Sequence, residues 1–177
     1  MPQSNGQLYP EIARPSNGTR KQGGPRKGRF SAALLAGQAS IATAINNLGE
    51  IVGSSQRSDG TVASFFWENG TMHDIGRVGG DDHGRAWAIN DLGEVVGLSY
   101  GGNTDLNGPG GHPYIWDVVH GMRPLAPLVR GDRADVHRVF QNYTVFSINN
   151  KGEILGLSYL PKTRSMVLLR PIVHAPD

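Results

Sequence analysis

Apolar residues recur in one arrangement at three places along the chain, each time around a short polar turn. In the central copy, Ala88 and Ile89 precede the polar segment 90–94, and Val95 and Val96 follow it. The pattern occupies residues 44–53, 88–97 and 147–156. A self-similar unit of this length fixes the architecture of a chain. The pattern therefore predicts a repeat protein.

Each copy is typical of two strands joined by a tight turn. The turn has the form Asn-x-x-Gly-Glu, in which asparagine bonds its own backbone and glycine accepts a positive φ. The apolar residues after the turn, such as Val95 and Val96, are adjacent rather than alternating. Adjacent side chains in a strand point to opposite faces, so both faces are expected to be buried. Sheets stacked face to face satisfy that requirement.

Further strands follow each turn and complete three units, at about residues 38–80, 81–128 and 140–174. Asn69-Gly70 predicts a two-residue hairpin in the first unit. The predicted strands are 41–46, 50–54, 62–67 and 72–75, then 85–90, 94–99, 113–116 and 122–125, and finally 143–149, 153–158 and 166–170. The third unit lacks a fourth strand, and residues 31–37 are expected to form a strand that supplies it by pairing the two chain ends.

The predicted fold is all-β: a partial or oligomer-completed β-propeller-like array of about three four-stranded blades. Closed propellers have about 4–8 blades. Three interpretations therefore stay open: a piece of a longer array, two copies that close one ring as a homo-oligomer, or an open stack of sheets.

Charge divides the chain into two parts. Residues 1–30 carry six basic residues and one acidic residue, whereas the remainder carries 11 basic and 14 acidic residues. The first part is poor in apolar residues and is predicted to be a disordered basic leader, ahead of a β-repeat domain at 31–177. It suggests binding to nucleic acid or another anionic polymer, although a solvated linker is the simpler interpretation. No apolar segment approaches the ~18 residues of a membrane span.

The repeated motifs resemble a known family. The segments 42–54, 86–99 and, more loosely, 145–158 match Ala-x-Ala-Ile-Asn-x-x-Gly-x-Val-Val-Gly-x-Ser, and 63–67 and 70–80 match the motifs that follow it. The sequence resembles the HAF-repeat family of predicted bacterial extracellular repeat proteins. The resemblance covers about residues 34–170. It implies a β-propeller-like scaffold in the bacterial cell envelope or exterior, with no established reaction.

Two polar clusters are candidate sites. Asp81, Asp82 and His83 lie in the connection between the first and second units, and carboxylates with an imidazole suit metal binding or acid–base catalysis. The next connection carries a second cluster, Asp132, Asp135 and His137. The two clusters would approach each other if these connections gather at one end of the array. Polar turns rich in aspartate and glycine are a simpler explanation.

The tryptophans and one loop supply weaker candidates. Trp67 and Trp116 occupy equivalent strand positions, which favours packing between units over sugar stacking. Trp87 replaces Thr43 and Phe146 at its position, so it is the tryptophan first suspected of ligand contact. The loop residues Asn103, Asp105 and Asn107 resemble the start of a calcium loop but lack the acidic residue at its twelfth position.

The sequence therefore favours a non-catalytic binding or structural module that needs no cofactor. The sequence does not identify the ligand, for which a glycan and a protein are both candidates. The alternatives are an enzyme or metal site at Asp81, Asp82 and His83, and anionic-polymer binding by the leader.

Overall fold

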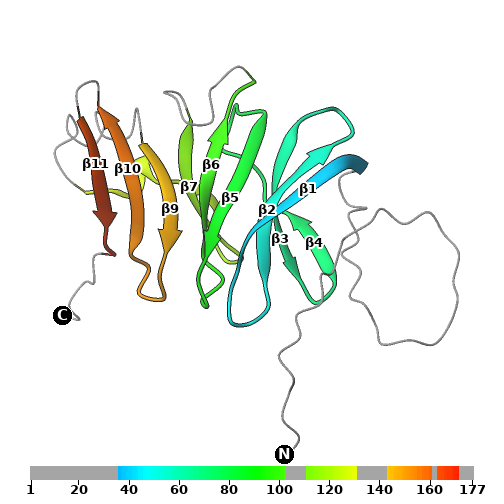
Figure 1. Cartoon of the computed structure of the whole chain (residues 1–177), viewed down its shortest axis with the longest axis horizontal. Helices are drawn as coiled ribbons and strands as arrows, with labels where there is room; N and C mark the ends of the chain where they lie inside the picture. The colour runs from blue at the N-terminus through cyan, green and yellow to red at the C-terminus, as the bar shows by residue number, and fades with distance from the viewer. Residues whose placement is uncertain (1–35, 103–110, 131–142, 161–162, 172–177) are drawn as a thin grey trace, which may run out of the picture.

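The computed structural model describes residues 36–102, 111–130, 143–160 and 163–171, which form an all-β fold. Eleven strands make three separate antiparallel sheets that stand side by side in a row (Figure 1). Each sheet is a meander in which strands adjacent in sequence are also adjacent in space. The only helix among these residues is a single 3-10 turn, η2 (Ala126–Leu128).

The sheets follow the order of the sequence repeats. The first sheet contains β1 (Ala36–Ile45), β2 (Ile51–Arg57), β3 (Val62–Glu68) and β4 (Thr71–Asp74). The second contains β5 (His83–Ile89), β6 (Val95–Tyr100), β7 (His112–Asp117) and β8 (Gly121–Pro124). The third contains β9 (Tyr143–Ile148), β10 (Ile154–Leu160) and β11 (Thr163–Leu169). All eleven strands predicted within the three units are present, with ends that shift by up to five residues.

The predicted turns have the backbone that their residues favour. Asn69 and Gly70 join β3 to β4 with φ values of 49° and 87°, as a two-residue hairpin with two positive φ angles requires. Within β6, Gly97 is needed for another reason. A Cβ atom there would lie 2.1 Å from the carbonyl oxygen of Arg85 on β5, so the close approach of these strands depends on glycine.

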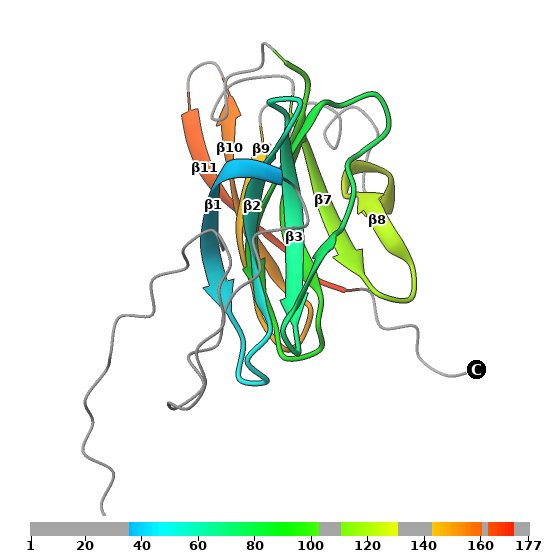
Figure 2. The ribbon, with the colours of Figure 1, turned by 90° about the vertical axis from the view of Figure 1, so that its right-hand side faces the viewer.

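Two apolar cores hold the row of sheets together. The core between the first and second sheets consists of Val52, Phe66, Ile75, Ala86, Ile89, Val95 and Tyr114. The core between the second and third sheets consists of Val96, Ile115, Leu125, Tyr143, Val145, Ile148 and Ile154. In the view onto the end of the row, β1, β2 and β3 lie in front of the other strands (Figure 2). The middle sheet is thus covered on both faces.

Burial on both faces was predicted for every sheet. It holds throughout the middle sheet and in part of the first, where the successive β3 residues Phe65 and Phe66 are 3% and 6% exposed. Val95 and Val96 are both fully buried, one in each core. In the third sheet, Ile154 is buried whereas Leu155 is 37% exposed. Each outer sheet packs against one other sheet among the described residues, and its other face carries the exposed apolar side chains, such as Ile45 and Leu155.

The strand expected at residues 31–37 is corrected in part. Ala36 pairs with Arg57 and belongs to β1 in the first sheet, so residues 36 and 37 do not complete the third sheet. Residues 31–35 and the leader at 1–30 lie outside the described residues. The third sheet has three strands among the residues that the structure describes. Residues 36 and 37 cannot serve as its fourth strand, because they are part of β1, which forms a hairpin with β2.

Candidate functional site

The three repeated asparagines each close their own turn. The Asn90 side-chain oxygen accepts the backbone N–H groups of Leu92 and Glu94 at 3.0 and 2.9 Å. Its Nδ2 group donates to the Glu94 carboxylate at 2.6 Å. Asn46 and Asn149 make the same three bonds in their own turns. The prediction that these asparagines form turns is confirmed.

The same side chains also link one sheet to the next. Nδ2 of Asn46 donates to the backbone carbonyl of Asn90 at 3.0 Å, although the two residues are 44 positions apart. Nδ2 of Asn90 donates in turn to the carbonyl of Asn149 at 3.0 Å, across 59 positions. The three turns therefore form a hydrogen-bonded series, which we call the asparagine ladder (Asn46, Asn90 and Asn149).

A second series of bonds runs beside the asparagine ladder. The carboxylate of Asp91 accepts the backbone N–H of Asn47 at 2.9 Å and the Asn47 side-chain amide at 2.7 Å. It also accepts the Asn150 side-chain amide at 2.8 Å, and the Asp91 N–H donates to the Asn150 side chain at 2.9 Å. The hydrogen bonds from Asn47 and then Asn150 lower the pKa of Asp91. One carboxylate thus joins all three turns.

The proposed acid–base cluster does not converge on one point. The Asp81 carboxylate, largely buried, contacts Nδ1 of His112 at 2.9 Å. Nδ1 of His83 accepts the backbone N–H of Val62 on the first sheet at 3.0 Å. The Asp82 side chain is exposed, and the backbone carbonyl of Asp82 accepts a hydrogen bond from the Arg77 guanidinium at 2.6 Å. His83 thus joins the second sheet to the first, Asp81 joins the connection to β7, and Asp82 bonds within the connection.

Trp116 and Trp87 lie at the sheet interfaces. The Trp116 ring lies 5.2 Å from the Phe66 ring of the preceding sheet, which confirms the packing predicted for it. Trp67 is half-buried at the equivalent register position of the first sheet, since Ile51 pairs with it as Val95 pairs with Trp116. Trp87, suspected of ligand contact, packs against the core between the second and third sheets.

Several candidates fall outside the described residues. The calcium-loop residues Asn103, Asp105 and Asn107 are among them, and so are Asp132, Asp135 and His137. Within the ranges that the structure covers, no group of three or more His, Asp or Glu side chains is placed to hold a metal ion. No helix in those ranges is long and apolar enough to cross a membrane.

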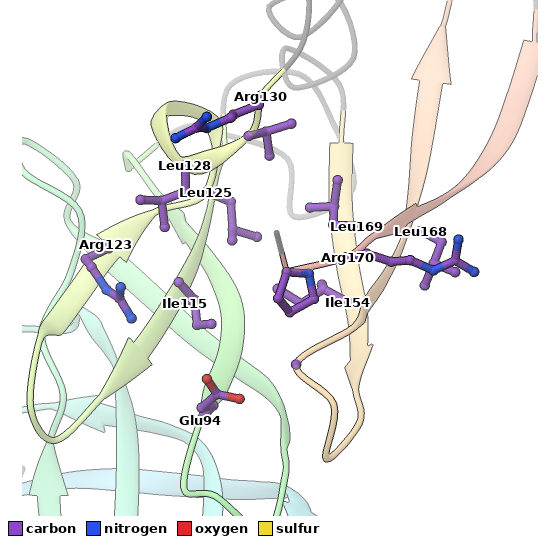
Figure 3. A pocket seen from close by; sticks show the side chains of 13 residues that line it. Glu94, Ile115, Arg123, Leu125, Leu128, Arg130, Ile154, Leu168, Leu169 and Arg170 are labelled. Carbon is purple, nitrogen blue, oxygen red and sulfur yellow. The ribbon is translucent and has the colours of Figure 1, made fainter. Parts of the chain in front are cut away.

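A cleft opens between the second and third sheets, with a volume of about 560 Å³ (Figure 3). Leu125 and Leu128 lie on one wall, and Ile154 and Leu169 on the other. Its lining also includes one carboxylate, Glu94, and three guanidinium groups, from Arg123, Arg130 and Arg170. Two of these are paired: Arg123 with Asp117, and Arg170 with Glu153. The cleft therefore has apolar walls, with charged groups of both signs around it.

Sequence reasoning found neither the cleft nor the asparagine ladder. The signal for the ladder was present, because an asparagine recurs at one position of every unit. The signal for the cleft was that Leu169 stands where the first two units have Trp67 and Trp116.

No family model, no curated protein and no solved structure matches this chain.

Proposed function

We propose that this protein is a non-catalytic binding and structural module of the bacterial cell envelope or exterior. The asparagine ladder is the observation that carries the proposal. In this ladder, the asparagines that recur in every unit form hydrogen bonds between sheets. A scaffold gains from such bonds, since satisfied buried polar groups fix one arrangement of the elements. The resemblance to HAF-repeat proteins supports the location.

The main alternative, an enzyme or metal site at Asp81, Asp82 and His83, fits the geometry less well. Asp81 is paired with His112, and the ring nitrogen of His83 accepts a backbone N–H. His83 also stacks on Tyr100, with the ring centroids 5.1 Å apart. These contacts give Asp81 and His83 a structural role.

Metal titration separates the two functions. We expect calcium, magnesium and zinc each to leave the thermal midpoint of the full chain unchanged, and Asp82→Ala to leave it unchanged as well. A rise in the midpoint with one metal, abolished by Asp82→Ala, would establish the alternative. Fractionation of the cells that carry the gene tests the location, and recovery in the cytosol would contradict it.

The cleft favours a second candidate function, which is the binding of a small ligand that carries an acid group on an apolar chain. The apolar walls suit the chain, and the guanidinium group of Arg130, which belongs to neither of the two ion pairs named above, suits the acid. Octanoate is therefore expected to bind more tightly than octanol in a calorimetric titration. Arg130→Ala should weaken octanoate alone, whereas Arg164→Ala, outside the cleft lining, should have no effect. Equal binding of both compounds would exclude a role for the arginines.

Anionic-polymer binding by residues 1–30 stays a prediction. It requires DNA affinity that falls as salt rises and that disappears when these residues are deleted. Affinity retained after the deletion would end this hypothesis.

A further inference from the structure

The two ends of the row of sheets carry the unmatched halves of one interface. Between sheets, a donor in one turn meets an acceptor in the following turn. At the first sheet, the Asn46 carbonyl accepts the Gly49 N–H. Within the described residues, it receives no hydrogen bond from the asparagine side chain of a preceding turn. At the third sheet, Nδ2 of Asn149 donates to Glu153 and to no further turn in that part of the chain. One end offers an acceptor and the other a donor.

The second series of bonds ends in the same way. In the middle of the row, the Asp91 N–H donates to the side-chain oxygen of Asn150. The equivalent N–H in the third turn belongs to Asn150, and the equivalent acceptor in the first turn is the side-chain oxygen of Asn47. Neither of these two atoms has a partner in another turn among the described residues. Each end therefore presents two hydrogen-bonding positions that match the other end.

On the outer face of the first sheet, the exposure of Ile45 agrees with this, whereas Phe65 on the same face is buried. Ile45 is 65% exposed, whereas its equivalents Ile89 and Ile148 are 8% and 7% exposed. Ile89 belongs to the core against the first sheet, and Ile148 to the core against the second. Ile45 thus lacks the preceding sheet that covers its two equivalents.

The outer face of the third sheet shows the complementary exposure. Leu155 and Leu168 pair across β10 and β11 and are 37% and 47% exposed. Their equivalents are the pairs Val52–Phe66 and Val96–Ile115, in which no side chain is more than 9% exposed. Phe146, at 50% exposure, extends the same face. This surface has the composition of an interior and lacks the following sheet.

We propose that copies of this chain associate head to tail. The outer face of the third sheet packs on the outer face of the first sheet of the next copy. Asn149 then donates to the Asn46 carbonyl of that copy, and Asn150 to its Asn47 side chain. The contact continues the interfaces already present inside the chain. It joins two different surfaces and is heterologous, so it closes into a ring or extends as a filament.

The proposal rests on the structural role assigned above and names the partner of that scaffold. It predicts that a charge on either end face prevents association while leaving the monomer folded, because the substituted side chains are exposed in the monomer. Ile45→Glu blocks the first face, and Leu168→Glu blocks the third. Leu92→Glu is the matched control, since Leu92 is 67% exposed on the middle turn and belongs to neither end face.

Light scattering on a sizing column tests the proposal with the full chain. Wild type and Leu92→Glu are expected to form oligomers, and each end-face variant to elute as a monomer of 19.0 kDa, with association at least ~10-fold weaker. An equimolar mixture of Ile45→Glu and Leu168→Glu keeps one intact pair of faces, so it is expected to form a dimer that grows no further. Circular dichroism confirms the fold of each variant.

Three outcomes would overturn the inference: a wild type that stays monomeric at millimolar concentration, end-face variants that still associate, or a mixture that stays monomeric. The second would mean that like faces meet instead, because each variant keeps one intact face. None of these results touches the metal titration or the fractionation experiment, so failure of the head-to-tail contact is distinguishable from failure of the proposed function.

Discussion

The two interfaces within the row are built from the same repeat but are filled differently. At the first, the aromatic rings of Phe66 and Trp116 meet, and the fully buried Tyr114 hydroxyl donates to Ser64 Oγ at 2.8 Å. At the second, Leu169 stands in the tryptophan position and an open cleft remains. The comparison shows that the third unit, which lacks the tryptophan of the other two, still stacks on its neighbour but leaves a cleft at the interface.

The largest expected effect compares one residue from each core. Tyr114→Ala should lower the free energy of unfolding by about 3–5 kcal/mol, because it empties a fully buried site and leaves Ser64 without its partner. Ile154→Ala should cost less, about 2–3 kcal/mol, since Ile154 already borders the cleft. Urea denaturation measures both values. A larger loss for Ile154→Ala would mean that the second interface is the tighter one.

Removal of one step of the asparagine ladder should have the next largest effect. Asn90→Ala removes four hydrogen bonds from a side chain that is 3% exposed, and should cost about 2–3 kcal/mol. Asn149→Ala is the matched control. It removes the three bonds within a turn at an exposed position and should cost about 1 kcal/mol. Equal losses in thermal unfolding would show that the bonds between sheets contribute nothing.

Restoration of the missing aromatic should stabilise the second interface. Leu169→Trp places the larger ring against the cleft, as Trp116 is placed at the first interface, and should raise stability by about 1 kcal/mol. Leu168→Trp is the control, because Leu168 is 47% exposed and should give little change. Chemical denaturation distinguishes the two. A destabilised Leu169→Trp would mean that the cleft walls cannot accept the ring.

The smallest expected effect is on the pH dependence of stability, to which the two interfaces contribute differently. Because hydrogen bonds lower the pKa of Asp91 below its unfolded value of 3.8, the stability it contributes is present above that value. It is lost as the pH falls through the lower folded pKa. Thermal midpoints between pH 7 and pH 2 should therefore fall less steeply for Asp91→Asn than for wild type.

The two partners of Asp91 sharpen this measurement. Asn47 at the first interface lowers the Asp91 pKa more than Asn150 at the second. Asn47→Ala should therefore reduce the acid sensitivity more than Asn150→Ala does. The reverse order would assign the dominant bonds to the second interface.

Much of the fold followed from local patterns. The Asn-x-x-Gly-Glu turns and the Asn69-Gly70 hairpin were predictable because each turn is stabilised by bonds within a few residues. The expectation for residues 31–37 was wrong at residues 36 and 37, since β1 continues its pairing with β2 up to Ala36. Pairing between distant strands has no local signal, so the sequence did not reveal which sheet would take them.

The candidate site residues were likewise predictable only as far as local sequence determines their contacts. Asp81, Asp82 and His83 are adjacent in sequence, yet the side chains of Asp81 and His83 contact different partners, which only the packing of the sheets selects. Trp87 was suspected because its position varies between units, but a variable residue inside an interface fills space just as well.

By itself, the sequence determined the turns, the strands and their grouping into three units, because backbone preferences and short-range hydrogen bonds are local properties. Only the tertiary structure decided that the asparagines join the units, that both faces of the middle sheet are buried, and that Leu169 leaves a cleft. These features depend on contacts between residues more than forty positions apart, and the spacing of a repeat does not specify how its copies stack.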